Sequence, residues 1–288
     1  MASTITLKRR ISSIRSTRQI TKAMELVSAS KLRRAQEQAT QSRDYRQAAY
    51  GLLSRLNQIQ EVERQPLFRR RNVKNRLYVV ITSNSGLAGA YNSNVLRLLS
   101  HHIQDDRTQS VKSHVITIGN KAAQFSRRIA GLELVAVYPA FGDHPTANDI
   151  RPILNTLIGR YKDESIDEIL VLYTVFRSSI SQQTISLPLL PAKLEETDAA
   201  NKFVVMNFEP DVETVINQVA TSLIEVQIWQ ALLESLASEH SMRTLAMKSA
   251  TDNANELIDD YTLEYNTARQ GAITQELAEI TGGAEAMK

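Results

Sequence analysis

Residues 212–272 read VETVINQVATSLIEVQIWQALLESLASEHSMRTLAMKSATDNANELIDDYTLEYNTARQGA, with no glycine or proline before Gly271. Alternating steps of four and three residues from Val212 select mostly apolar or small side chains. These are Ile216, Val219, Leu223, Val226, Gln230, Leu233, Ala237, His240, Thr244, Met247, Thr251, Ala254, Ile258, Tyr261, Tyr265, Ala268 and Ala272. A seven-residue repeat sustained over this length is typical of a coiled coil. The segment therefore predicts one long helix with a partner helix packed along it.

A second long helix is predicted at the other end of the chain, from Thr4 to about Leu56. Its apolar positions are Leu7, Ile11 and Ile14, then Ile20, Ala23, Met24 and Val27, and later Tyr45, Ala48, Ala49, Leu52, Leu56 and Ile59. The pattern is amphipathic, with a shift of phase near Thr17. We expect this helix to pair antiparallel with the C-terminal helix, with partner residue numbers that sum to about 268, give or take one turn. Residues beyond about Tyr265 would then project as a single helix.

The distribution of charge supports this pairing, although the net charge of the chain is only +3. Residues 1–76 hold 18 Lys/Arg against 5 Asp/Glu, whereas residues 209–288 hold 4 against 14. Each end would repel itself if left alone, so the basic and acidic ends are expected to meet. Two independently solvated charged faces remain the alternative.

The middle of the chain has another pattern, and all seven prolines lie between Pro66 and Pro210. Strands are predicted at 77–82, 115–118, 132–137, 169–176, 185–190 and 203–208, the last two at sheet edges, and helices at 94–102, 121–128 and 149–161. This alternation predicts a mostly parallel sheet covered on both faces. The predicted fold class is therefore α/β: a long antiparallel coiled coil of the N- and C-terminal helices with an inserted Rossmann-like α/β domain. The expected domains are 1–57 (N-terminal coiled-coil helix), 58–208 (α/β domain) and 209–288 (C-terminal coiled-coil helix).

The sequence offers little support for catalysis. The loop from Thr82 to Asn92 follows the first strand, where a doubly wound fold binds a nucleotide. Its glycines, Gly86 and Gly89, fit neither the dinucleotide pattern nor a phosphate-binding loop. The favoured interpretation is a tight strand-to-helix turn capped by Asn or Ser. Cysteine is absent, the five histidines lack metal-ligand spacing, and no G-x-S-x-G occurs. We therefore expect no catalytic residue, no cofactor and no metal.

Two other classes of function are disfavoured by the same kind of reasoning. The basic N-terminal helix could bind phosphates, but its first 44 residues contain no aromatic residue on which a base could stack. Nucleic-acid binding is therefore not expected. No run of about 18 apolar residues is present, so no membrane insertion is expected. The N-terminus carries neither a secretory signal nor a transit peptide pattern, which favours a bacterial origin.

Three blocks of sequence are more specific. They are ITKAMELVSASK (20–31), MRTLAMKSATDNA (242–254) and YNTARQGAITQELAEI (265–280), and the loop SGLAGAYN (85–92) adds to them. Together they resemble the gamma subunit of F-type ATP synthases, the central rotor shaft. The resemblance spans essentially the whole chain and is strongest at both ends. It implies the same architecture that the residue pattern predicts.

The resemblance also implies a function and partners. The subunit would couple rotation of the c-ring to conformational change at the catalytic beta subunits of a proton-translocating synthase, with no catalytic site of its own. Its partners would be three alpha and three beta subunits, the epsilon subunit and the c-subunit ring. Lys22 and Met24 match residues that face a moving loop of beta, and Arg269, Gln270, Thr274 and Glu276 match upper contacts with the catalytic ring. The implied location is peripheral, on the cytoplasmic face of the bacterial inner membrane or, alternatively, on the mitochondrial matrix side.

Overall fold

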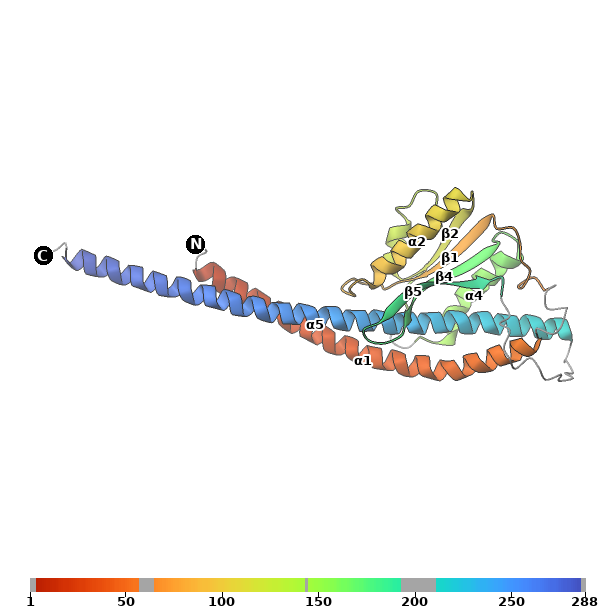
Figure 1. Ribbon diagram of the computed structural model, residues 1–288, viewed down its shortest axis with the longest axis horizontal. Helices are drawn as coiled ribbons and strands as arrows, with labels where there is room; N and C mark the ends of the chain where they lie inside the picture. Colours follow the sequence, from red (N-terminus) through yellow and green to blue (C-terminus); the bar gives the residue numbers. More distant parts are fainter. Residues whose placement is uncertain (1–3, 57–64, 143–144, 193–210, 286–288) are drawn as a thin grey trace. The chain divides into compact units, whose positions relative to one another are not determined.

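The computed structural model describes residues 4–56, 65–142, 145–192 and 211–285 (Figure 1). It divides into two compact units, residues 1–28 with 243–288 and residues 29–242. Helix α1 (Thr4–Leu56) and helix α5 (Val212–Glu285) each run through both units. We call residues 1–28 with 243–288 the shaft unit, and residues 29–242 the body unit.

The body unit contains the predicted α/β domain. Among the described residues, one sheet has five strands in the order β3-β2-β1-β4-β5. The strands are β1 (Asn75–Ile81), β2 (Lys112–Ile118), β3 (Glu133–Tyr138), β4 (Glu168–Phe176) and β5 (Gln182–Leu190), and the helices are α2 (Tyr91–Thr108), α3 (Asn120–Ser126) and α4 (Ala147–Lys162). Strands β1 to β4 are parallel, and β5 pairs antiparallel with β4 at the sheet edge. The mostly parallel sheet is therefore confirmed, whereas the predicted strand at 203–208 lies outside the described residues.

Strand β1 shows why both faces of the sheet are covered. Leu77, Val79 and Ile81 point into a core that contains residues of α4 and of α5 between Ile216 and Leu232. Tyr78 and Val80 point into a second core, formed with residues of α2 and α3. Because successive side chains of a strand alternate between faces, a continuous apolar strand requires cover on both sides.

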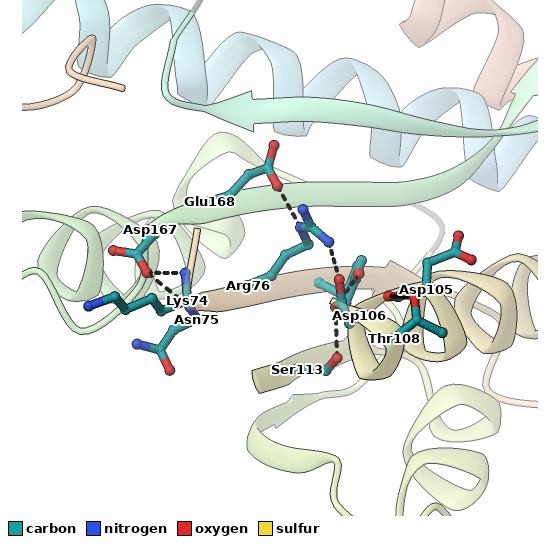
Figure 2. Close-up of polar contacts among 10 residues, drawn as sticks. Lys74, Asn75, Arg76, Asp105, Asp106, Thr108, Ser113, Asp167 and Glu168 are labelled. Atoms are coloured by element: carbon teal, nitrogen blue, oxygen red, sulfur yellow. Dashed lines mark hydrogen bonds and ion pairs between the residues drawn. The ribbon is translucent and has the colours of Figure 1, made fainter. Parts of the chain in front are cut away.

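A buried ionic network joins the amino ends of the strands (Figure 2). The carboxylate of Asp106 is fully buried and accepts hydrogen bonds from Tyr78 Oη at 2.7 Å, Ser113 Oγ at 2.8 Å and the guanidinium of Arg76. Arg76 Nε also donates to Glu168 at 2.5 Å. Burial, together with the bond to Asp106, raises the pKa of the Tyr78 hydroxyl well above its ordinary value, so this group stays a neutral donor. The network ties α2, β1, β2 and β4 together at this edge.

We predict that Asp106→Ala destabilises the chain by about 2–4 kcal/mol, because it leaves the charged Arg76 and two buried hydroxyls without their acceptor. The free energy of unfolding from urea denaturation measures the loss. Asp105→Ala is the matched control, since Asp105 is the preceding residue of α2 and is exposed. It should change the stability by less than about 0.5 kcal/mol. Equal losses in the two variants would contradict the role of the network.

Candidate partner-contact surface

The carboxyl edge of the sheet, where open α/β folds bind ligands, is closed in this chain. Gly119 has φ +100°, and a Cβ there would lie 2.1 Å from the carbonyl oxygen of Thr82, so the ends of β1 and β2 approach closely. A pocket between these strand ends has a volume of about 20 Å³, and Leu232, Leu236 and Glu239 of α5 form one of its walls. This volume is enough for about one water molecule. Helix α5 itself therefore fills the crevice in which a nucleotide would lie.

The loop after β1 is a strand-to-helix turn, as predicted, but the predicted cap is wrong. The N-cap of α2 is Ala90, which makes no side-chain capping bond. Asn92 instead accepts a hydrogen bond from the backbone N–H of Ser83 at 3.0 Å, and its amide donates to Ser83 Oγ at 2.8 Å. Ser83 and Asn92 thus bind one another rather than the amino end of α2, while Asn84 accepts hydrogen bonds from the backbone N–H groups of Asn120 and Ala140.

The heptad pattern predicted for α5 is confirmed in the shaft unit, where the members Met247, Thr251, Ala254 and Ile258 are buried. In the body unit the members Ile216, Leu223, Val226, Gln230, Leu233, Ala237 and His240 are buried too, but Ile216 and Leu223 lie in the core on the sheet. Tyr261, Tyr265 and Ala268 are partly covered, and every residue from 269 to 283 is exposed. The covered stripe therefore ends close to Tyr265, where the sequence predicted that pairing would stop.

The stripe predicted for α1 is right at its start and wrong further on. Leu7 and Ile11 are buried, but Ile20 and Val27 are 61% and 54% exposed. Steps of four and three from Leu7 lead instead through Ile14, Arg18, Thr21, Glu25 and Ser28 to Leu32 and Ala35, and all of these are buried or half-buried. From Leu7 to Ala35 the heptad of α1 is thus unbroken, and no phase shift occurs near Thr17. The predicted members from Tyr45 to Ile59 lie outside the residues whose side chains the structure describes. A search for apolar residues does not find this heptad line, because its middle members, such as Arg18, Thr21 and Ser28, are polar.

Three contacts in the shaft unit define the register of the two helices. The hydroxyl of Thr251 donates to Thr21 Oγ1 at 2.9 Å, and Arg18 donates to Asn255 Oδ1 at 3.2 Å. The guanidinium of Arg10 lies over the ring of Tyr261, 5.8 Å from its centroid. The residue numbers of these pairs sum to 271–273, one helical turn from the predicted 268. The antiparallel pairing is confirmed within the stated turn, and Met24 is level with Lys248.

Charges of opposite sign lie on the two helices of the shaft unit. Residues 4–28 carry six Lys/Arg and one Glu, whereas residues 243–283 carry three Lys/Arg and seven Asp/Glu. Among the described residues of the shaft unit, none of the six α1 cations lies within 4 Å of an α5 carboxylate. The basic and acidic ends therefore meet as helices, while their charged side chains stay solvated and attract at longer range.

The six residues singled out by resemblance fall into two zones of the shaft unit. Lys22 is exposed and its ammonium lies 2.9 Å from Glu25, and Met24 is half-buried. The other four are all exposed: Arg269, Gln270, Thr274 and Glu276. Lys22 is level with residue 250 of α5, about 30 Å along the helix from Arg269. The structure therefore does not bring the two sets together, and any contact they make is with different parts of a partner.

The pattern search missed a set of large apolar side chains that the shaft unit leaves 46–70% exposed. The set comprises Ile5, Ile20, Leu26, Val27, Leu245, Leu257, Leu263, Ile273, Leu277 and Ile280. Its last three members recur at steps of four and three, so they form one stripe on the end of α5 that α1 does not cover. Large exposed apolar surfaces mark sites of protein–protein contact. Large apolar residues that fall off the heptad line are the signal by which this surface could be found.

Two other kinds of site, a metal centre and a membrane span, find no support in the described part of the chain. Within it, no group of three or more His, Cys, Asp or Glu side chains is placed to hold a metal ion. No helix in the same part combines the length and the hydropathy that a bilayer span requires. The arrangement defines a class of protein: an antiparallel two-helix coiled coil with an inserted α/β domain and an apolar surface open to partners.

Comparison with known proteins identifies the family. The sequence profile of the ATP synthase family matches residues 3–287. Curated relatives over the full length of both chains include the ATP synthase gamma chains of Psychrobacter sp. (strain PRwf-1), 36% identical over 293 residues, and Stenotrophomonas maltophilia (strain R551-3), 39% identical over 288 residues. The chain belongs to the ATP synthase family and, within it, to the gamma chains.

Solved structures agree on the fold. A chain of the Euglena gracilis mitochondrial ATP synthase, in an assembly of OSCP, F1 and c-ring, matches with a TM-score of 0.69 at 19% identity over 99% of this chain and 94% of that one. A chain from the central stalk and c-ring of Tetrahymena thermophila mitochondrial ATP synthase matches with a TM-score of 0.64 at 22% identity, over 80% and 99% of the two chains. The coiled coil with an inserted domain is thus shared across distant sequences.

The register makes a prediction that is easy to test, because the chain contains no cysteine. We expect Thr21→Cys with Thr251→Cys to form a disulfide on mild oxidation, since their side chains already touch and a disulfide needs Cα atoms within about 7 Å. The control pair, Thr21→Cys with Thr244→Cys, places the second thiol about 10 Å further along α5 and should stay reduced. Mobility on a non-reducing gel reports the bond. Closure of the control pair alone would refute the register.

Proposed function

We propose that this chain is the central-stalk rotor subunit of a proton-translocating F-type ATP synthase. In this role it couples rotation of the c-ring to conformational change at the catalytic beta subunits. The observation that carries the proposal is the uncovered end of α5, where residues 269–283 are exposed on every side and Ile273, Leu277 and Ile280 form an apolar stripe. Such a surface favours burial by partner chains. Membership of the gamma-chain family supports the same conclusion.

The proposed partners follow from the two zones of the shaft unit. Three alpha and three beta subunits would surround it, with Lys22 and Met24 facing a moving loop of beta. Arg269, Gln270, Thr274 and Glu276 would make the upper contacts with the ring. The epsilon subunit and the c-ring would hold the α/β domain, residues 58–208, and the adjoining parts of the coiled-coil segments 1–57 and 209–288. Neither nucleic acid nor direct membrane insertion enters this proposal.

The subunit is proposed to be non-catalytic and peripheral. The narrow crevice at the carboxyl edge of the sheet supports the absence of a catalytic site, because α5 residues line it and leave a volume of about 20 Å³. The proposed location is the cytoplasmic face of a bacterial inner membrane, with the matrix side of a mitochondrion as the alternative. There the subunit would take part in ATP synthesis and proton transport.

Co-purification tests the proposal directly. The tagged chain is expressed with the other subunits of its own operon, and the bound proteins are quantified. We expect three alpha and three beta subunits for each tagged chain, retained after nuclease treatment and a high-salt wash. A chain that purifies alone, or whose bound material is nucleic acid lost in high salt, would contradict the proposal.

We predict that Met24→Lys weakens coupling more than it weakens assembly. The new ammonium, beside Lys22 and Arg18, would seek an acidic group on the surrounding ring, in a contact worth a few tenths to about 3 kcal/mol depending on burial. That contact would have to break and re-form as the shaft turns. Proton pumping per ATP hydrolysed measures coupling, and Met24→Leu is the volume-matched control. Equal pumping by the Met24→Lys and wild-type complexes would show that the assignment of Met24 is wrong.

We also predict that the isolated chain neither binds nor hydrolyses ATP, because its crevice has room for about one water molecule. Isothermal titration calorimetry with ATP and Mg²⁺ should give no binding heat, while the assembled complex serves as the positive control. A micromolar dissociation constant for the chain alone would overturn this expectation.

A further inference from the structure

Three buried serines of α5 hold the helix to the α/β domain within the body unit. Ser235, Ser238 and Ser241 recur every third residue and are 0%, 0% and 2% exposed. The hydroxyl of Ser235 is hydrogen-bonded to that of Tyr91 at 2.7 Å, and Ser238 Oγ donates to the carbonyl of Thr174 at 3.1 Å. The three serines span about 9 Å along the helix axis. They form a short line of hydroxyl groups along the helix.

The third serine binds the turn between β4 and β5. Ser241 Oγ donates to the carbonyl of Ser179 at 3.0 Å and accepts from Gln182 Nε2 at 3.1 Å. The turn is also held internally, since the backbone N–H groups of Arg177 and Ser178 donate to the carbonyl of Ser181 at 3.2 and 3.0 Å. A rigid turn on the sheet is thus fastened to α5 by two bonds at one residue.

These bonds do something that the neighbouring apolar core cannot do. The apolar packing of α5 residues between Ile216 and Leu232 holds the helix on the sheet. Because the hydrophobic effect has no preferred direction, this packing does not fix the rotational position of the helix. Hydrogen bonds are directional, and a buried hydroxyl that loses its partner is destabilising. The three serines bind three different places: the start of α2, strand β4 and the β4–β5 turn. Rotation of α5 about its own axis would break all of these bonds at once.

We propose that Ser235, Ser238 and Ser241, with Gln182, form the joint that fixes the rotational position of α5 on the α/β domain and transmits torque between them. The inference rests on the proposed rotor function. Under that function the α/β domain is driven by the c-ring, and α5 carries the rotation onward into the shaft unit, which begins at Arg243. The serines act as positioning residues, since they touch neither nucleotide nor proton.

The test uses the assembled complex with the triple variant Ser235→Ala, Ser238→Ala and Ser241→Ala. The control is Ser222→Ala, a half-buried serine of the same helix section. Three quantities are measured: ATP hydrolysis, proton pumping per ATP, and the angular fluctuation of a bead fixed to the α/β domain while the ring is immobilised. We expect hydrolysis to be kept, pumping per ATP to fall and the fluctuation to widen in the triple variant alone. Amide exchange in the β4–β5 turn should accelerate about tenfold, equivalent to about 1.4 kcal/mol.

The results of this experiment distinguish a failure of the serine joint from a failure of the proposed rotor function. Unchanged pumping and fluctuation in the triple variant would overturn the joint while leaving the rotor proposal standing. A wild-type complex that neither pumps nor rotates would overturn the rotor proposal itself. If the triple variant does not assemble, Gln182→Ala decides, because it removes the bond to Ser241 Oγ together with the two bonds that Gln182 Nε2 donates to the carbonyls of Ser178 and Ser179. It should widen the fluctuation by a smaller amount, and no change there would also overturn the joint.

Discussion

The antiparallel pairing of α1 and α5 in the shaft unit, in a seven-residue register, is the constraint on which the other features depend. In the shaft unit the seam includes small polar side chains, Thr21, Ser28 and Thr251, between buried apolar residues such as Leu7 and Ile258. Small side chains allow two helices to approach closely, and the bond between Thr21 and Thr251 gives the approach a fixed register. Large apolar residues such as Ile20 and Val27 are consequently left outside the seam, where they form a surface for partners.

In the body unit α5 belongs to two packing systems at once. Its heptad members Ile216 and Leu223 belong to the core on the sheet, whereas Leu233 and Ala237 are buried outside that core. Since the same helix also closes the crevice at the carboxyl edge, the α/β domain keeps the topology of a nucleotide-binding fold without room for the ligand. Apolar burial holds the domain to the helix, and the serine bonds orient it.

Much of this architecture could be predicted from the sequence, and the exceptions have physical causes. The heptad of α5 and the buried strands are periodic in hydrophobicity, so a pattern reveals them. The seam of α1 is periodic in position but polar at Arg18, Thr21 and Ser28, so a search for apolar residues shifted its phase. The network around Asp106 joins residues from four elements, so no pattern within a single segment of the sequence predicts it. The contact roles of Lys22 and Arg269 came from resemblance alone, and they stay predictions.

Locking the seam tests most directly whether the two helices turn as one rigid shaft. In the assembled complex, Thr21→Cys with Thr251→Cys would be oxidised, and rotation of a bead on the α/β domain would be followed while ATP is hydrolysed by the immobilised ring. The account predicts that rotation continues at the rate of the reduced complex, because the disulfide joins atoms that never move apart. Arrest of rotation on oxidation, and its recovery on reduction, would show that the helices slide past each other and would contradict the account.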